Sequence, residues 1–179
     1  MQFIPGFSRE RSAMPLKARH AVYLHSYGRI RQPVSRGDAA PMKKVLILCT
    51  GNSARSQMAE GLLRHEAGER FEVFSAGTKP TKLRPEAIAV MQELGIDISH
   101  QRSKSVDDFL GQKFDYVITV CDNARESCPV FPGPALYIHW SLVDPATARG
   151  SEDERKLVFR RIRDEIAERL KSFAAGEKA

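Results

Sequence analysis

The sequence predicts an α/β fold of three layers, in which helices flank a four-stranded parallel sheet. Two observations favour this class. Short β-branched segments alternate along the chain with segments of helical period, which is the pattern of parallel strands joined by crossover helices. The chain also has 179 residues, of which 42% are hydrophobic and 28% are charged. That length and composition suit one globular domain with a substantial core.

The first predicted strand covers residues 45–48, which are all apolar, and it ends at Cys49. A loop of small residues follows, and from Arg55 the pattern becomes helical. The apolar residues that share one side of this helix are Met58, Ala59, Leu62 and Leu63. A strand, a tight loop and a helix therefore open the fold, and the remaining elements are expected to pack around them.

Three more strands are predicted at residues 71–76, 116–120 and 135–140, because these segments are rich in β-branched and aromatic residues. Between the first two lies a helix that begins at Pro85, with Ile88, Met91 and Leu94 on its apolar face and Gly95 at its end. A short helix is expected near residues 106–110. Residues 122–134 are expected to form a loop, with room for a helical turn before its prolines.

The last predicted element is a long helix that starts at a capping box formed by Ser151 and Glu154. Its apolar residues recur at helical spacing, which predicts one face against the core. These residues are Phe159, Ile162, Ile166 and Phe173. In a parallel sheet, ligands bind beyond the carboxyl ends of the strands. The functional residues should therefore follow the strands at that edge.

The loop after Cys49 has the composition of an oxyanion-binding loop. Successive backbone N–H groups at a helix N-terminus form a concavity that attracts negative charge. The residues expected to hold the oxyanion are Thr50, Gly51, Asn52, Ser53, Ala54 and Arg55, and the planar Arg55 guanidinium can bind two oxygens. The same field favours a Cys49 thiolate, which is a nucleophile for phosphorus or a similar centre. The alternative is a buried core cysteine beside an ordinary turn.

Two other candidates follow strands at the same edge of the predicted sheet. Cys121 ends the third strand, and Asp144-Pro145 follows the fourth. A carboxylic acid near an oxyanion pocket can protonate a leaving oxygen, which would make Asp144 a general acid. The alternative for Asp144 is a structural Asp-Pro turn.

The spacing of Cys121 and Cys128 fits neither a zinc site nor a Cys-x2-Cys redox pair, and we expect no metal site and no cofactor. If the segment between them were helical, its rise would separate the two residues by roughly 10 Å. A disulfide requires Cα atoms about 4.4–6.8 Å apart. Such a bond would therefore require the segment to bend or unwind.

The net charge of +6 is concentrated at one end of the chain. Residues 1–41 carry seven Lys and Arg and two acids, a net +5, which leaves +1 for the remainder. We therefore expect a disordered basic extension over 1–41, a domain over 42–179 with Met42 as a natural start, and no nucleic-acid binding. No apolar run approaches a membrane span, so no membrane association is expected. Three cysteines are too few for a disulfide-stapled fold, which favours the cytoplasm.

Taken together, these motifs resemble the thioredoxin-coupled arsenate reductases, which have the low-molecular-weight protein tyrosine phosphatase fold. The resemblance covers Met42 to about Phe173. The matching segments are Cys49-Thr-Gly-Asn-Ser-Ala-Arg-Ser, Ser75-Ala-Gly-Thr, Cys121-Asp-Asn-Ala-Arg-Glu-Ser-Cys-Pro, His139-Trp and Asp144-Pro. The loop alone would fit the phosphatases equally well, whereas the combination of loop, cysteine pair and Asp-Pro is highly specific.

The resemblance implies a function and a role for each site residue. Cys49 would attack arsenate held by the loop and Arg55, Ser56 would hydrogen-bond the thiolate, and Asp144 would protonate the departing oxygen. Cys121 would attack the Cys49 adduct and release arsenite, and Cys128 would then form a disulfide with Cys121. Thioredoxin would reduce this disulfide. We expect a monomer.

Some relatives bind potassium near the loop through residues that match Asn52, Glu60 and Ser75, plus an acid. Lys104 occupies the place of that acid, so its ammonium group is expected where the ion would sit. Two other functions stay open from the sequence. One is a phosphotyrosine phosphatase, which would leave Cys121 and Cys128 without a catalytic role. The other is an oxyanion-binding regulator, which would need no activated cysteine.

Overall fold

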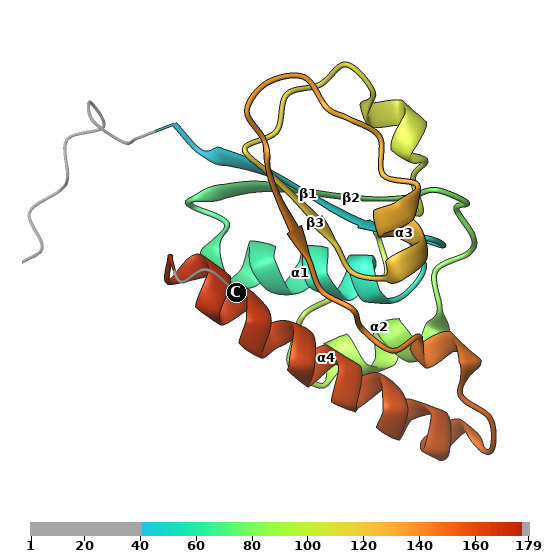
Figure 1. The fold of residues 1–179 in the computed structure, drawn as a ribbon. Helices are drawn as coiled ribbons and strands as arrows, with labels where there is room; N and C mark the ends of the chain where they lie inside the picture. The colour runs from blue at the N-terminus through green and yellow to red at the C-terminus, as the bar shows by residue number, and fades with distance from the viewer. Residues whose placement is uncertain (1–40, 177–179) are drawn as a thin grey trace, which may run out of the picture. The chain divides into compact units, whose positions relative to one another are not determined.

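The computed structural model describes residues 41–176, and Figure 1 shows the arrangement of their helices and strands. Four parallel strands form one sheet in the order β2-β1-β3-β4. Their bounds are Lys43–Cys49 for β1, Phe71–Gly77 for β2, Tyr116–Thr119 for β3 and Leu136–His139 for β4. The predicted four-stranded parallel sheet is confirmed.

Helices cover both faces of this sheet. The bounds of the helices are Arg55–Ala67 for α1, Pro85–Gln92 for α2, Asp122–Glu126 for α3 and Glu152–Ala174 for α4, with short 3-10 helices η2 at Val106–Phe109 and η3 at Pro145–Thr147. Helices α1, α2 and α4 pack against one another on one face, and α3 and η2 lie on the other (Figure 1). The three predicted layers are therefore confirmed.

The central strand β1 is the core of the fold. Residues 45–48 have no solvent exposure, because β1 pairs with β2 and β3 along its edges and other elements cover both faces of the sheet. A strand buried on both faces is expected to be continuously apolar, as this one is. The four predicted apolar residues of α1 are also buried: Met58, Ala59, Leu62 and Leu63. The loop that follows β1 is thus attached to fully buried elements of the core.

Helix α4 follows its prediction closely. The Ser151 hydroxyl accepts the N–H of Glu154 at 3.3 Å, and the Glu154 carboxylate accepts the N–H of Ser151 at 2.7 Å. This reciprocal pair satisfies two N–H groups that a helix start leaves without intrahelical partners. All four predicted core residues are buried: Phe159, Ile162, Ile166 and Phe173.

The prediction for α2 is wrong in one respect. The helix ends at Gln92, and Leu94 lies beyond it with 46% of its surface exposed. Its buried residues are Ala87, Val90 and Met91, because α4 packs along that side. Ile88 is half-buried. The short chain of Ala87, which gave no signal as a core residue, allows this close approach of the two helices.

The prediction that residues 1–41 form a disordered extension falls almost entirely outside the described residues. Among the residues that the structure does describe, no helix is long and apolar enough to cross a membrane.

We expect the segment before Met42 to be dispensable. It is basic, contains prolines and has no sustained apolar period, so it offers little surface for burial. A chain beginning at Met42 should keep the melting temperature and activity of the full chain. Thermal unfolding and an activity assay on both chains would check this. A large loss in either quantity would show that residues 1–41 pack on the domain.

Candidate active site

The sulfur of Cys49 lies at the centre of the loop between β1 and α1. The Asn52 N–H donates to Cys49 Sγ at 3.0 Å, and the Ser56 hydroxyl lies 2.9 Å from the same sulfur. Asn52 adopts a φ of +43°, a conformation that Asn tolerates better than most residues, and this turns its N–H inward. The Cys49 sulfur is thus held by two groups of its own loop and helix.

A chain of buried polar groups orients Ser56. The Asn52 side-chain amide donates to Ser56 Oγ and to Ser75 Oγ, each at 2.8 Å. Because Ser56 Oγ accepts this bond, its hydroxyl proton is free to point at Cys49. The Asn52 amide oxygen accepts from Gln57 Nε2 at 3.1 Å. The Asn52 side chain therefore stabilises the loop through hydrogen bonds to α1 and β2.

The predicted oxyanion-binding residues line one cavity of about 260 Å³, and only Asn52 is absent from its walls. The lining residues from the loop are Cys49, Thr50, Gly51, Ser53, Ala54 and Arg55, and Asp144 and Ala146 close the other side. The cavity lies at the carboxyl edge of the sheet, at the N-terminus of α1. Partial positive charge from the helix and loop N–H groups makes this a site for an anion.

Arg55 and Asp144 face each other across this cavity. Arg55 Nη2 lies 3.2 Å from Asp144 Oδ2, and Arg55 Nη1 donates to the Leu142 carbonyl at 2.9 Å. The other Asp144 oxygen accepts the N–H of Ala146 at 3.1 Å and so begins η3. Asp144 is thus both the turn residue and the only carboxylate that lines the cavity among the described residues. The turn role of Asp144 is confirmed by its geometry, and its role as a general acid stays a prediction.

Cys121 lies at the rim of the same loop. Its Sγ is 3.4 Å from Thr50 Oγ1, and Cys121, Thr50, Arg55 and Asp144 line an adjoining hollow. Cys121 is 6% exposed. A second thiol therefore lies beside the Cys49 loop, as predicted from the ends of the strands.

Cys128 is half-buried at the far end of α3, and all three cysteines are free. Burial raises the pKa of the Cys128 thiol. The N–H groups of Arg125 and Ser127 bond to the carbonyls of Cys121 and Asn123, so the helical turn for which the predicted loop left room is the five-residue helix α3. A helical rise over seven residues is roughly 10 Å, which exceeds the reach of a disulfide.

Glu60 is buried beneath the loop and neutralised by two cations. Its carboxylate lies 3.2 Å from Lys104 Nζ and 2.7 Å from Arg64 Nη2, and it also accepts the Ser75 hydroxyl. The Lys104 N–H donates to the Asn52 amide oxygen at 2.8 Å. The Lys104 ammonium therefore lies against the carboxylate, as the sequence predicted.

We expect the Lys104 ammonium group to replace a bound cation by balancing the charge of the Glu60 carboxylate. Potassium should stabilise the protein no more than sodium at equal ionic strength. Lys104→Gln should lower the free energy of unfolding by about 1.5–3 kcal/mol, since hydrogen bonds to charged groups contribute that much. Lys82→Gln, which removes the same charge from an exposed position, serves as the control. Equal stability of the two variants, or a specific response of the parent to potassium, would contradict this role.

Three cavity residues were missed from the sequence: Lys79, Thr81 and Arg84. They come from the segment between β2 and α2, whose backbone is bonded to the loop. The Lys79, Thr81 and Arg84 N–H groups donate to the carbonyls of Thr50, Gly51 and Ser53. The sequence held a signal for these residues, because their segment follows β2 at the same carboxyl edge of the sheet and is rich in basic residues. Two more positive charges therefore surround the anion site.

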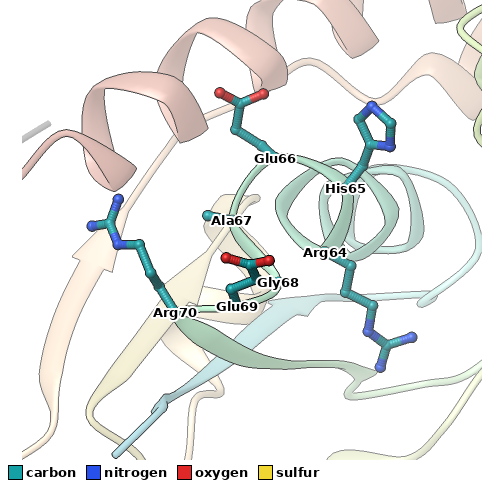
Figure 2. A pocket seen from close by; sticks show the side chains of 7 residues that line it. All are labelled: Arg64, His65, Glu66, Ala67, Gly68, Glu69 and Arg70. Atoms are coloured by element: carbon teal, nitrogen blue, oxygen red, sulfur yellow. The ribbon is translucent and has the colours of Figure 1, made fainter. Parts of the chain in front are cut away.

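A separate hollow of about 420 Å³ lies at the other end of α1 and has a different character (Figure 2). It is lined by residues 64–70, whose side chains diverge; Glu66 points toward α4, and His65 and Arg70 point to opposite sides. Arg64 and Arg70 are engaged by the Val73 and Ala174 carbonyls. No cysteine lines this hollow. Among the described residues, no cluster of His, Cys, Asp or Glu is arranged to hold a metal ion.

The fold and this loop define a class: an α/β protein that presents a cysteine beneath an oxyanion-binding loop at the carboxyl edge of a parallel sheet. The chain belongs to the low molecular weight phosphotyrosine protein phosphatase family, whose model matches residues 44–178.

The chain is similar to several arsenate reductases. It is 47% identical to the arsenate reductase of Halalkalibacterium halodurans over 132 residues. This match covers 74% of this chain and 95% of the relative. A solved arsenate reductase in the phosphate binding state has a TM-score of 0.62 and 34% identity, covering 76% of this chain and all of that one. The thioredoxin-dependent arsenate reductase of Corynebacterium glutamicum has a TM-score of 0.58 and 32% identity, covering 78% of this chain and 66% of that one.

Proposed function

We propose that this chain reduces arsenate to arsenite with Cys49, Cys121 and Cys128 and that thioredoxin recycles it. The observation that carries the proposal is the 3.4 Å approach of Cys121 Sγ to Thr50 Oγ1 at the rim of the Cys49 loop. A phosphatase needs one thiol, whereas a reductase needs a second thiol within reach of the first. The similar chains named as arsenate reductases support the choice of substrate.

The first step is attack by Cys49 on the arsenic atom. Arsenate is a tetrahedral oxyanion, and the loop N–H groups and the Arg55 fork supply donors for its oxygens. An oxyanion that binds Arg55 replaces Asp144 as its partner, so the Asp144 carboxyl group becomes free to protonate the leaving oxygen. A sulfur–arsenic bond forms, and water departs.

The second and third steps are thiol exchanges that move two electrons. The Cys121 thiolate attacks Cys49 Sγ, a disulfide forms, the sulfur–arsenic bond breaks, and its electron pair stays on arsenic as arsenite. The Cys128 thiolate then attacks Cys121 Sγ and releases Cys49 as a thiolate. Each exchange requires the attacking sulfur to approach the sulfur under attack.

The order of the two exchanges follows from the environment of each thiol. Cys121 lies beside the loop, whereas Cys128 lies beyond a helical segment. Burial raises the pKa of Cys128, which keeps it a neutral thiol in the reduced enzyme. Because only thiolates attack, Cys128 becomes active when α3 unwinds and exposes it. We infer that a monomer then presents the Cys121–Cys128 disulfide to thioredoxin in the cytoplasm.

Weak hydrolysis of aryl phosphates is a side activity that the same geometry supports. Cys49, Arg55 and Asp144 line one cavity without any contribution from Cys121 or Cys128. A phosphate ester would bind as arsenate does, and water would release the phosphorylated cysteine. Measuring this hydrolysis therefore reports on the Cys49 loop alone, independently of Cys121 and Cys128.

The test is arsenate-dependent oxidation of reduced thioredoxin, followed through NADPH consumption by its reductase. We expect multiple turnovers that require arsenate and all three thiols. Absence of oxidation, together with efficient hydrolysis of an aryl phosphate, would make the protein a phosphatase.

A further inference from the structure

The residue after Cys121 is fixed from two sides. A hydrogen bond of 2.9 Å joins Asp122 Oδ1 to His139 Nε2, and the Ser141 hydroxyl donates to Asp122 Oδ2 at 3.0 Å. His139 is the last residue of β4, and Ser141 lies two residues beyond it. Both oxygens of the Asp122 carboxylate are therefore held by the neighbouring strand and the segment that follows it.

The His139 ring connects Asp122 to Thr119. Its second ring nitrogen, Nδ1, lies 2.8 Å from Thr119 Oγ1 at the end of β3. Because both ring nitrogens have side-chain partners, the imidazole is not available as a base for a cysteine. The hydrogen bond from His139 lowers the pKa of Asp122, so the carboxylate stays charged and can accept both bonds near neutral pH. His139 is half-buried, and its ring has a polar role.

We propose that Asp122, His139 and Ser141 form a clamp that positions Cys121 for attack on Cys49, an inference that rests on the proposed function. Asp122 is the first residue of α3 and is covalently joined to Cys121. Fixing its carboxylate to β4 fixes the start of α3, and with it the Cys121 sulfur beside Thr50. These three are positioning residues, because none of them lines the oxyanion cavity beside Cys49; Asp122 lines only the adjoining hollow, next to Cys121.

The clamp also determines which end of the segment moves. Formation of the Cys121–Cys128 bond requires residues 121–128 to unwind, and the clamp anchors only the Cys121 end. At the other end, the Cys128 N–H makes a 3.4 Å bond to the Arg125 carbonyl. Long hydrogen bonds are weaker than those near 2.9 Å. Cys128 therefore moves toward a stationary Cys121.

If Asp122 acted only through its charge, its removal would change the rate of attack by Cys121 in the opposite direction from the loss of a clamp. Removing the negative charge of Asp122 favours a neighbouring thiolate, so Cys121 would attack faster if charge alone mattered. Loss of positioning makes the attack slower, because small displacements of a nucleophile are costly in rate. The direction of the change thus separates the two effects.

The experiment measures closure of the Cys49–Cys121 disulfide without arsenate, in a Cys128→Ser background. Dithiobis(nitrobenzoate) converts one of the two thiols to a mixed disulfide and releases one thionitrobenzoate. The second thiolate then attacks that sulfur, forms the protein disulfide and expels a second thionitrobenzoate. The rate of this second, reagent-independent release is compared for the parent, Asp122→Ala, Asp122→Asn, Ser141→Ala and Glu126→Gln. Glu126 is an exposed acid on the same helix.

We expect Asp122→Ala to slow closure by about 10- to 100-fold, the range that misplacement of a reacting group can cost. Ser141→Ala and Asp122→Asn should lose less, because each keeps part of the clamp, and Glu126→Gln should match the parent. Binding of inorganic phosphate should be the same in all five proteins, which shows that each is folded around an intact loop. Unchanged or faster closure in folded Asp122→Ala and Asp122→Asn would overturn the clamp. Slower closure in these variants, together with no arsenate turnover by the protein that keeps all three cysteines, would overturn only the proposed reductase function.

Discussion

Cys121→Ser is expected to abolish arsenate reduction and to leave weak hydrolysis of an aryl phosphate intact. The hydroxyl cannot replace the thiolate that resolves the Cys49 adduct, whereas Cys49, Arg55 and Asp144 stay in their cavity. Thioredoxin oxidation and release of the aryl alcohol, measured on the same preparation, would show this split. Cys49→Ser is the matched control and should abolish both activities, because no other described cysteine lines the cavity.

The outcome for Cys121→Ser decides between the two functions that the sequence left open. If this variant turned over arsenate with thioredoxin at the parent rate, Cys121 would be a structural residue. The position of its sulfur beside Thr50 would then be incidental, and the phosphatase interpretation would take first place.

Asp144→Asn is expected to lower the rate of arsenate reduction by ~10²–10⁴, the usual contribution of general acid catalysis. The amide keeps the size of the side chain and an oxygen that can accept the Ala146 N–H, so η3 should persist. It cannot supply the proton for the leaving oxygen. Single-turnover formation of arsenite, with phosphate binding measured alongside, separates chemistry from binding.

Asp153→Asn provides a control for charge, because Asp153 is an exposed acid far along the chain at the start of α4. It should leave the rate unchanged. If Asp144→Asn also left it unchanged, Asp144 would be a turn residue only, and water or the substrate itself would supply the proton.

Most of the fold was predictable because local patterns and burial agree. The strand at residues 45–48 reads as apolar because both of its faces are covered, and the capping box of Ser151 and Glu154 marks the start of α4 unambiguously. Helix α2 was less predictable. Leu94 is hydrophobic enough to suggest a core position, but the helix ends at Gln92, and its buried residues are Ala87, Val90 and Met91.

The parts of the candidate site that could be predicted are those whose residues are neighbours in the sequence or directly follow predicted strands. Cys49, the loop and Arg55 are close in sequence, and Cys121 and Asp144 follow strands that end at the same edge. Contacts between distant segments gave weaker signals. The Asp122 clamp depends on the register of β3 against β4, which places Thr119 opposite His139. The basic residues Lys79 and Arg84 reach the cavity only because their segment is bonded to the loop.

The Cys128→Ser variant tests the central claim most directly, because it stops the cascade after the second thiol has acted. Treated with arsenate, it should form at most one arsenite per enzyme and then stall with Cys49 bonded to Cys121. Mass spectrometry of the trapped protein, digested without reduction, locates that bond, and quantification of arsenite gives the stoichiometry. A peptide pair linking Cys49 to Cys121 with one equivalent of arsenite is the predicted result. Repeated turnover with thioredoxin, or arsenite formation without this disulfide, would contradict the three-cysteine cascade.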